Sequence, residues 1–183
     1  MATPTITTPE GIDVPIQKLQ NRFTNNLWTG VRTDDATKNK VYNSYGRAVI
    51  VEGVPKVFNP AAVNDSYFEL LMNDRVSAQS FFIVNDNSRT GFDEFEADVS
   101  LYFMVNLGHL SSLSTRAEQE VINDARAYLR NEPYGFTIDA IVSGAESVSD
   151  FDQVKVKDNL QPYFCFRFDF LVSLHMLCEY SVI

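Results

Sequence analysis

The chain has 183 residues, of which 45% are hydrophobic and 21% are charged, and its formal net charge at neutral pH is −9. This composition is typical of a globular protein that buries a core of its own, and it excludes a disordered chain. An acidic domain repels phosphate, which argues against wrapping or reading nucleic acid. The charge either serves solubility alone or forms a negatively charged wall past which DNA slides without adhering.

The cysteine count and the apolar runs narrow the class of protein further. Two cysteines, Cys165 and Cys178, do not make a disulfide scaffold, so we expect buried free thiols. No run approaches 18 apolar residues, so no transmembrane helix is expected. The first residues lack the basic and apolar regions of a secretory signal, and the protein is expected to stay in the compartment where it is made.

The first structured element is predicted to be a helix. Residues 1–11 are rich in Thr and Pro and are predicted to be a flexible arm, with a single domain over 12–183. Asp13 is positioned to cap the helix, and Pro15 suits its first turn. An apolar stripe at four- and three-residue steps then runs through Ile12, Ile16, Leu19, Phe23 and Leu27.

Several strands are predicted between this helix and residue 107. Residues 41–51 are typical of a strand, and 56–58 of a short strand that pairs back onto it. Residues 59–76 are open to either a helix or a strand. The run 78–84 is predicted to form an antiparallel hairpin with the alternating run 95–107, joined by the turn-forming residues 85–91.

The second half of the chain predicts one more helix and two more strands. Thr115 and Glu118 have capping-box spacing, and the apolar stripe of the helix is Val121, Ile122, Ala125, Tyr128 and Leu129. Strands are predicted at 136–142 and from Pro162 onward, where Phe164, Phe166, Phe168 and Phe170 share one face. The predicted fold class is therefore α+β, a mainly antiparallel sheet with both long helices packed on one face.

The other face of these strands is a candidate interface. It is amphipathic, and Tyr and Arg are common where proteins meet. An ordinary solvated sheet face explains the same pattern equally well. The candidate interface residues are Tyr102, Met104, Asn106, Tyr163 and Arg167.

No catalytic, cofactor-binding or metal-binding residue is predicted. His109 and His175 lack ligand spacing to other donors, and a zinc site needs four ligands. The densest acidic group, Asp93, Glu94, Glu96 and Asp98, flanks a predicted turn, whereas paired catalytic carboxylates need a shielded cleft. The phosphate-loop, dinucleotide and nucleophile-elbow motifs are absent from the sequence. The chain is therefore expected not to be an enzyme.

An ordered set of short motifs resembles a known class of protein. The motifs are Asn25-Asn26-Leu27-Trp28, Tyr45-Gly46-Arg47-Ala48, Ser80-Phe81-Phe82, Val105-Asn106-Leu107, the helix from Arg116 to Val121, and Leu160-Gln161-Pro162-Tyr163 before the Phe-rich strand. Together they resemble small virion proteins of tailed phages and prophages of Bacteroidetes-like hosts. In overall plan the chain also resembles tail-terminator and neck proteins, over about residues 12–175.

The resemblance implies a structural role in the virion. It implies a homo-oligomeric ring at the head–tail junction (a neck, tail-terminator or tail-completion protein) that contacts other copies of itself and neck, portal or tail-tube proteins. DNA would be met only as it passes through the lumen, and no membrane is involved. The termini and the loops 33–40, 85–91 and 143–153 would be contact segments. The alternative is a soluble adaptor or assembly chaperone that holds a partner by the aromatic sheet face.

Overall fold

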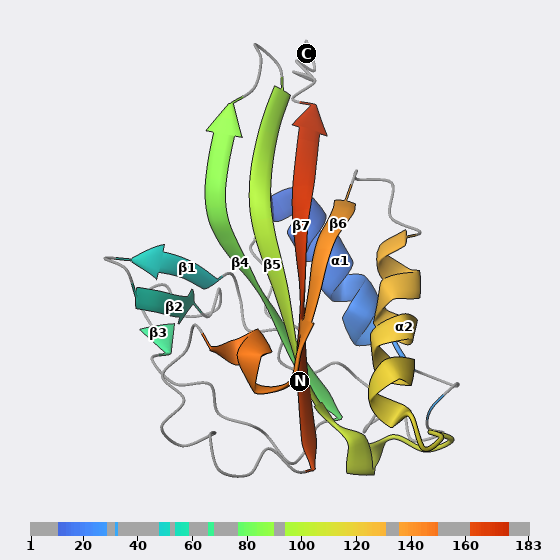
Figure 1. Cartoon of the computed structure of the whole chain (residues 1–183). Coiled ribbons are helices and arrows are strands. Elements are labelled where there is room, and N and C mark those ends of the chain that lie inside the picture. The colour runs from blue at the N-terminus through green and yellow to red at the C-terminus, as the bar shows by residue number, and fades with distance from the viewer. Residues whose placement is uncertain are drawn as a thin grey trace.

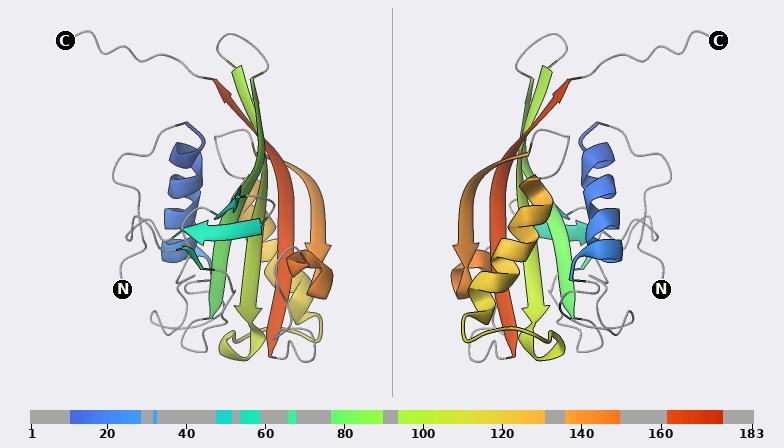
Figure 2. Two further views of the ribbon diagram at one scale, coloured as in Figure 1. Left: turned by 90° about the vertical axis from the view of Figure 1, so that its left-hand side faces the viewer. Right: turned by 90° about the vertical axis from the view of Figure 1, so that its right-hand side faces the viewer.

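A computed structural model of the chain describes residues 11–28, 32, 48–51, 54–58, 66–67, 77–89, 94–130, 136–149 and 162–175. Over these residues the fold is α+β, with both long helices on one side of a sheet (Figures 1 and 2). In chain order, the elements are α1 (Asp13–Asn26), β1 (Ala48–Val51), β2 (Val54–Phe58), β3 (Ser66–Tyr67), β4 (Ala78–Arg89), β5 (Glu94–Asn106), the 3₁₀ helix η1 (Leu107–His109), α2 (Ala117–Arg130), β6 (Phe136–Ser143), the 3₁₀ helix η2 (Gly144–Val148) and β7 (Tyr163–His175).

The described strands form one mainly antiparallel sheet in the order β3-β2-β1-β4-β5-β7-β6. Its centre is the four antiparallel strands β4, β5, β7 and β6, and the pairing of β1 with β4 is parallel. β2 pairs back onto β1, as predicted for residues 56–58. In the ambiguous segment 59–76, Ser66–Tyr67 is a short strand against β2, while 68–76 lies outside the described residues.

The core lies between the helices and the sheet and is centred on aromatic side chains. The Phe-rich strand faces the helices as predicted, with Phe164, Phe166, Phe168 and Phe170 all buried. Phe103 of β5 stacks on Phe166 with 4.8 Å between ring centroids and meets the edge of Phe23 from α1 at 5.3 Å. One aromatic group therefore joins a helix to the two central strands.

The apolar stripe of α1 faces this core, which confirms the predicted helix. Its buried side chains include Ile16, Leu19 and Phe23. The predicted cap is wrong, because Ile12 is the N-cap residue and Asp13 is already helical, with no side-chain capping bond. The helix ends at Asn26, and Trp28 follows in the left-handed region at φ 63°, with its ring buried in the core.

The hairpin of β4 and β5 is confirmed, but its connector is shorter than predicted. β4 continues through Arg89, so residues 85–89 are strand and not the expected turn. The register shifts between Val84 and Asp86, and beyond this shift Asp86 to Arg89 pair with residues 98 to 95 of β5. The continuing main-chain ladder outweighs the turn preference of Asn and Asp side chains, and a bulge absorbs the mismatch.

The predicted inner stripe of α2 is also confirmed, whereas its cap differs. Val121, Ala125 and Leu129 are buried, and Ile122 and Tyr128 are half-buried against the core. The polar contacts at the helix start come from Ser114 and Glu120. The expected capping box of Thr115 and Glu118 does not match the observed start, because the first helical residue is Ala117, one position later than that box requires.

Other predictions fall outside the described residues. These are the N-terminal arm 1–10, the loop 33–40, the first part of the strand 41–51 and the end of the connector 143–153, together with Asp93 and Cys178. The described start of that connector, Gly144–Val148, is η2, and the predicted strands at 136–142 and from Pro162 are β6 and β7.

Candidate functional site

A chain of polar contacts crosses the face of the sheet that is turned away from α1. The Asn85 side-chain amide donates to Ser100 Oγ at 2.9 Å, and Ser100 Oγ donates to Asp169 Oδ1 at 2.6 Å. Asp169 is also an ion-pair partner of Arg167, with Nε 2.9 Å from Oδ1. The pleat of three adjacent strands thus places four polar side chains from β4, β5 and β7 in one line.

An aromatic pair continues this line. The Arg167 guanidinium lies over the Tyr102 ring, 5.5 Å from its centroid, and an Arg167 Nη donates to the Tyr102 hydroxyl at 3.4 Å. Tyr102 stacks in turn on Phe81, with ring centroids 4.8 Å apart and planes 3° from parallel. Burial alone would lower the pKa of Arg167, but Tyr102 and Asp169 outweigh it and raise the pKa above its ordinary value. Arg167 therefore stays charged and is held in a fixed position.

The central part of this face is closed within the chain itself. Tyr102, Met104 and Cys165 are 1%, 2% and 0% exposed. Figure 2 shows η2 on this side of the sheet, opposite α1, and η2 packs on β7 with Ser147 and Val148 buried. The sequence allowed either an interface or a solvated surface here. In the structure this part of the face is buried within the chain and is neither of the two.

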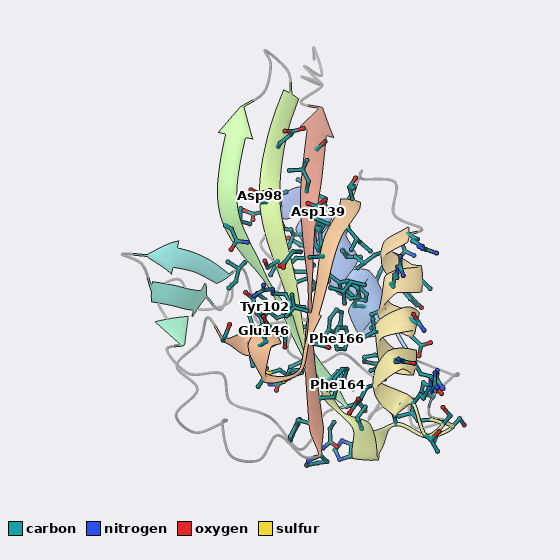
Figure 3. The ribbon with its side chains drawn as sticks, viewed as in Figure 1. Asp98, Tyr102, Asp139, Glu146, Phe164 and Phe166 are labelled. Carbon is teal, nitrogen blue, oxygen red and sulfur yellow. The ribbon has the colours of Figure 1, made fainter. Side chains whose placement is uncertain are left out.

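The five candidate interface residues therefore divide into two groups. Tyr102 and Met104 are buried side chains, and Asn106 is 4% exposed and has a structural role. Its side chain accepts the Gly108 backbone N–H at 3.0 Å to cap η1. Tyr163 and Arg167 keep part of their surface accessible. Tyr102, which Figure 3 labels, and Met104 are therefore inaccessible to a partner, whereas contact through Tyr163 and Arg167 stays a prediction.

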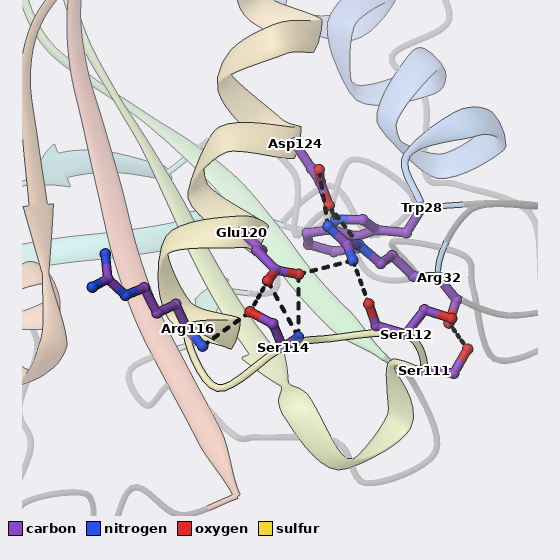
Figure 4. Close-up of polar contacts among 8 residues, drawn as sticks. All are labelled: Trp28, Arg32, Ser111, Ser112, Ser114, Arg116, Glu120 and Asp124. Carbon is purple, nitrogen blue, oxygen red and sulfur yellow. Dashed lines mark hydrogen bonds and ion pairs between the residues drawn. The ribbon is translucent and has the colours of Figure 1, made fainter.

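A second polar cluster lies at the start of α2 and is centred on Arg32 (Figure 4). Its guanidinium binds Asp124 with Nε to Oδ2 at 2.9 Å and Glu120 with Nη1 to Oε2 at 3.0 Å, and it donates to the Ser112 carbonyl at 2.8 Å. The Trp28 indole N–H donates to the same Asp124 carboxylate at 3.0 Å. These contacts fasten the segment after α1 to α2, and nothing in the sequence pattern indicated Arg32.

Ser114 and Glu120 complete this cluster at the helix start. Ser114 Oγ accepts the Arg116 backbone N–H at 3.1 Å, and the Glu120 carboxylate accepts from the Ser114 backbone N–H at 3.2 Å and from its hydroxyl. The Ser114 hydroxyl is the largest cause of a lowered pKa at Glu120, and Arg32 adds to it. Each charge in the cluster has a partner, which is the arrangement of a structural clamp.

The residues weighed for chemistry lie on three different elements. Cys165 is a buried free thiol, as expected, and burial raises its pKa to about 12, so it is not poised as a nucleophile. His109 lies in η1, and of the acidic group Glu94, Glu96 and Asp98 lie on β5, with Asp98 exposed. Within the described ranges, no group of three or more His, Cys, Asp or Glu side chains is arranged to hold a metal ion.

Comparison with known proteins adds no relative. No protein-family model, no curated protein and no solved structure matches the chain. Among the helices that the structure describes, none is both long enough and apolar enough to cross a membrane.

Proposed function

We propose that this chain is a structural virion protein that forms a homo-oligomeric ring at the head–tail junction of a tailed phage, as a neck, tail-terminator or tail-completion subunit. The proposal rests on the resemblance of its motifs to small virion proteins. The observation that best supports it is the fold plan, in which both helices lie on one face of a mainly antiparallel sheet. That is the plan which the resemblance to tail-terminator and neck proteins implies.

The distribution of charge is consistent with such a role. The chain is strongly acidic, and the exposed Asp98 lies on the long strand β5. A negative lumen would repel the phosphates of passing DNA and keep it from adhering. The charged clusters around Arg32 and Arg167 hold elements of the subunit together. A structural subunit needs such internal contacts, because its function depends on a fixed arrangement of its elements.

On the candidate sheet face, only the rim has accessible surface for contacts between subunits. A closed ring needs a head-to-tail contact between two different patches of each subunit. Tyr163 and Arg167 are the two candidate interface residues with accessible surface, and they lie on β7. The alternative function, an adaptor that grips a partner with the aromatic face, would need Tyr102 and Met104 to be accessible, and both are buried.

Negative-stain imaging of the purified full chain over a range of concentrations tests the proposal. We expect closed rings of one copy number, and we expect no retardation of duplex DNA on a gel at low salt. A folded protein that stays monomeric at the highest concentration, or one that binds DNA tightly, would contradict the proposal.

A further inference from the structure

We propose that β6 and α2 together form a two-fold contact between two copies of this chain. Among the described strands β6 is the outer one, paired with β7 along one edge and with no other described strand. Its side chains at Thr137, Asp139, Ala140, Ile141 and Ser143 are exposed. Ile141, at 38%, is the exposed large hydrophobic residue of the described chain.

Little on β6 prevents another strand from pairing with it. Outer strands are usually guarded by charges, prolines or bulges, because their unpaired backbone groups attract further strands. β6 has a bulge between Ile138 and Ala140 and one charge, Asp139. From Ala140 to Ser143 it has no charge and no proline, in a chain that is 21% charged. The unguarded half of the strand therefore includes the exposed Ile141.

The charge on β6 selects how a second copy would pair. A two-fold axis across the joined edges makes the strands antiparallel and places each residue opposite its symmetric counterpart. With the axis at Ile141, the two Ile141 side chains meet and shield each other from water. Asp139, the residue at the bulge, then lies near Ser143 of the second copy, where a hydroxyl can donate to its carboxylate. An axis at Asp139 would oppose two carboxylates instead, which is unfavourable.

The charges of α2 fit the same axis. α2 lies on the β6 side of the sheet and runs in the direction opposite to β6 (Figure 1). The axis would therefore bring the two α2 helices together antiparallel. Each α2 is acidic in its first turn, at Glu118 and Glu120, and basic in its last turn, at Arg130. Glu118 and Arg130 are both exposed. Glu118 of each copy can therefore pair with Arg130 of the other, which gives two symmetric ion pairs. This complementarity is the reason for taking a second copy as the occupant.

The inference does not depend on the proposed ring. A two-fold contact pairs copies or joins two rings face to face, whereas a ring closes through a different, head-to-tail contact. Failure to see rings would leave the two-fold contact standing, and the reverse holds as well.

Cysteine cross-linking tests the register directly. In a Cys178→Ser background, Ile141→Cys should form a covalent dimer under mild oxidation, because opposed residues in antiparallel strands have Cα atoms about 4.5–5.5 Å apart, within disulfide range. Asp139→Cys is the matched control, since its two copies would lie four residue steps, about 13 Å, apart. Mixing Asp139→Cys with Ser143→Cys should restore the cross-link. No cross-link at Ile141, or an equal yield from Asp139→Cys alone, would overturn the proposal.

Substitution of the surface charges provides an independent test. Glu118→Arg alone and Arg130→Glu alone should each raise the dissociation constant of the pair at least about tenfold. The double variant, which exchanges the two charges, should bring it back towards that of the parent. Circular dichroism would verify that each variant keeps its helices. If Ile141→Lys and both single reversals leave association unchanged, the contact lies elsewhere and the inference is wrong.

Discussion

The aromatic group around Phe103 is expected to be the main source of stability, and Phe103→Leu tests this quantitatively. The Phe103 ring is fully buried and meets rings from α1 and β7, stacked on Phe166 at 4.8 Å and edge-on to Phe23 at 5.3 Å. Each aromatic pair contributes about 0.5–1.5 kcal/mol beyond the area it buries. Leucine keeps most of the apolar volume and loses these two closest pairs, besides the wider pairs with Trp28 and Phe168, so the free energy of unfolding should fall by at least about 1–3 kcal/mol. Alanine would also leave a cavity, and the expected loss is then about 3–5 kcal/mol.

Urea unfolding followed by tryptophan fluorescence measures this change. Trp28 is the one tryptophan of the chain, it is buried, and its ring lies 6.5 Å from that of Phe103. Ser173→Ala is the matched control, because removal of an exposed hydroxyl from β7 should cost less than about 1 kcal/mol. A loss below about 0.5 kcal/mol for Phe103→Leu, or equal losses for Phe103→Leu and Ser173→Ala, would refute the assignment of Phe103 to the centre of the core.

Three further predictions concern single groups. Because burial raises the pKa of Cys165 to about 12, the native Cys178→Ser protein should react with a thiol reagent at pH 8 only as fast as it unfolds, and immediate reaction would contradict this. Because the pKa of Glu120 is lowered in the folded chain, its carboxylate stabilises the fold above the ordinary pKa of 4.5, and this contribution is lost as the pH falls through the folded pKa. Glu120→Gln should therefore lose less stability than the parent as the pH falls, as measured by urea unfolding at each pH. An equally steep loss in the variant would count against the Ser114 contact. Ser112 is held at φ 59° while its carbonyl binds Arg32, so Ser112→Gly should raise the melting temperature slightly, by the equivalent of about 0.5–1 kcal/mol, and a lower melting temperature would contradict the predicted strain.

Apolar periodicity predicted the parts of the fold whose structure depends on burial. The stripes of α1 and α2 and the alternation of β5 and β7 identified which side chains face the core, because one buried face leaves a repeat in the sequence. Local polar signals were less reliable. Asn85 to Arg89 resemble a turn yet continue β4, since backbone pairing with β5 decides their conformation.

The candidate site shows where sequence patterns stop being informative. Alternation correctly placed Tyr102, Met104 and Arg167 on the face away from the helices. It carries no information about a second layer on that face, so the burial of Tyr102 and Met104 could not be inferred. The Arg32 cluster was equally invisible, because Arg32 and Asp124 are 92 positions apart and only the tertiary fold brings them within 2.9 Å.

Sedimentation velocity of the purified full chain, from about micromolar to several hundred micromolar, tests most directly the claim that this protein acts by associating with its own copies. The account predicts a boundary that moves faster as concentration rises and settles at a multiple of the single-chain mass. A boundary that keeps the mass of one chain throughout this range, with secondary structure intact, would contradict it.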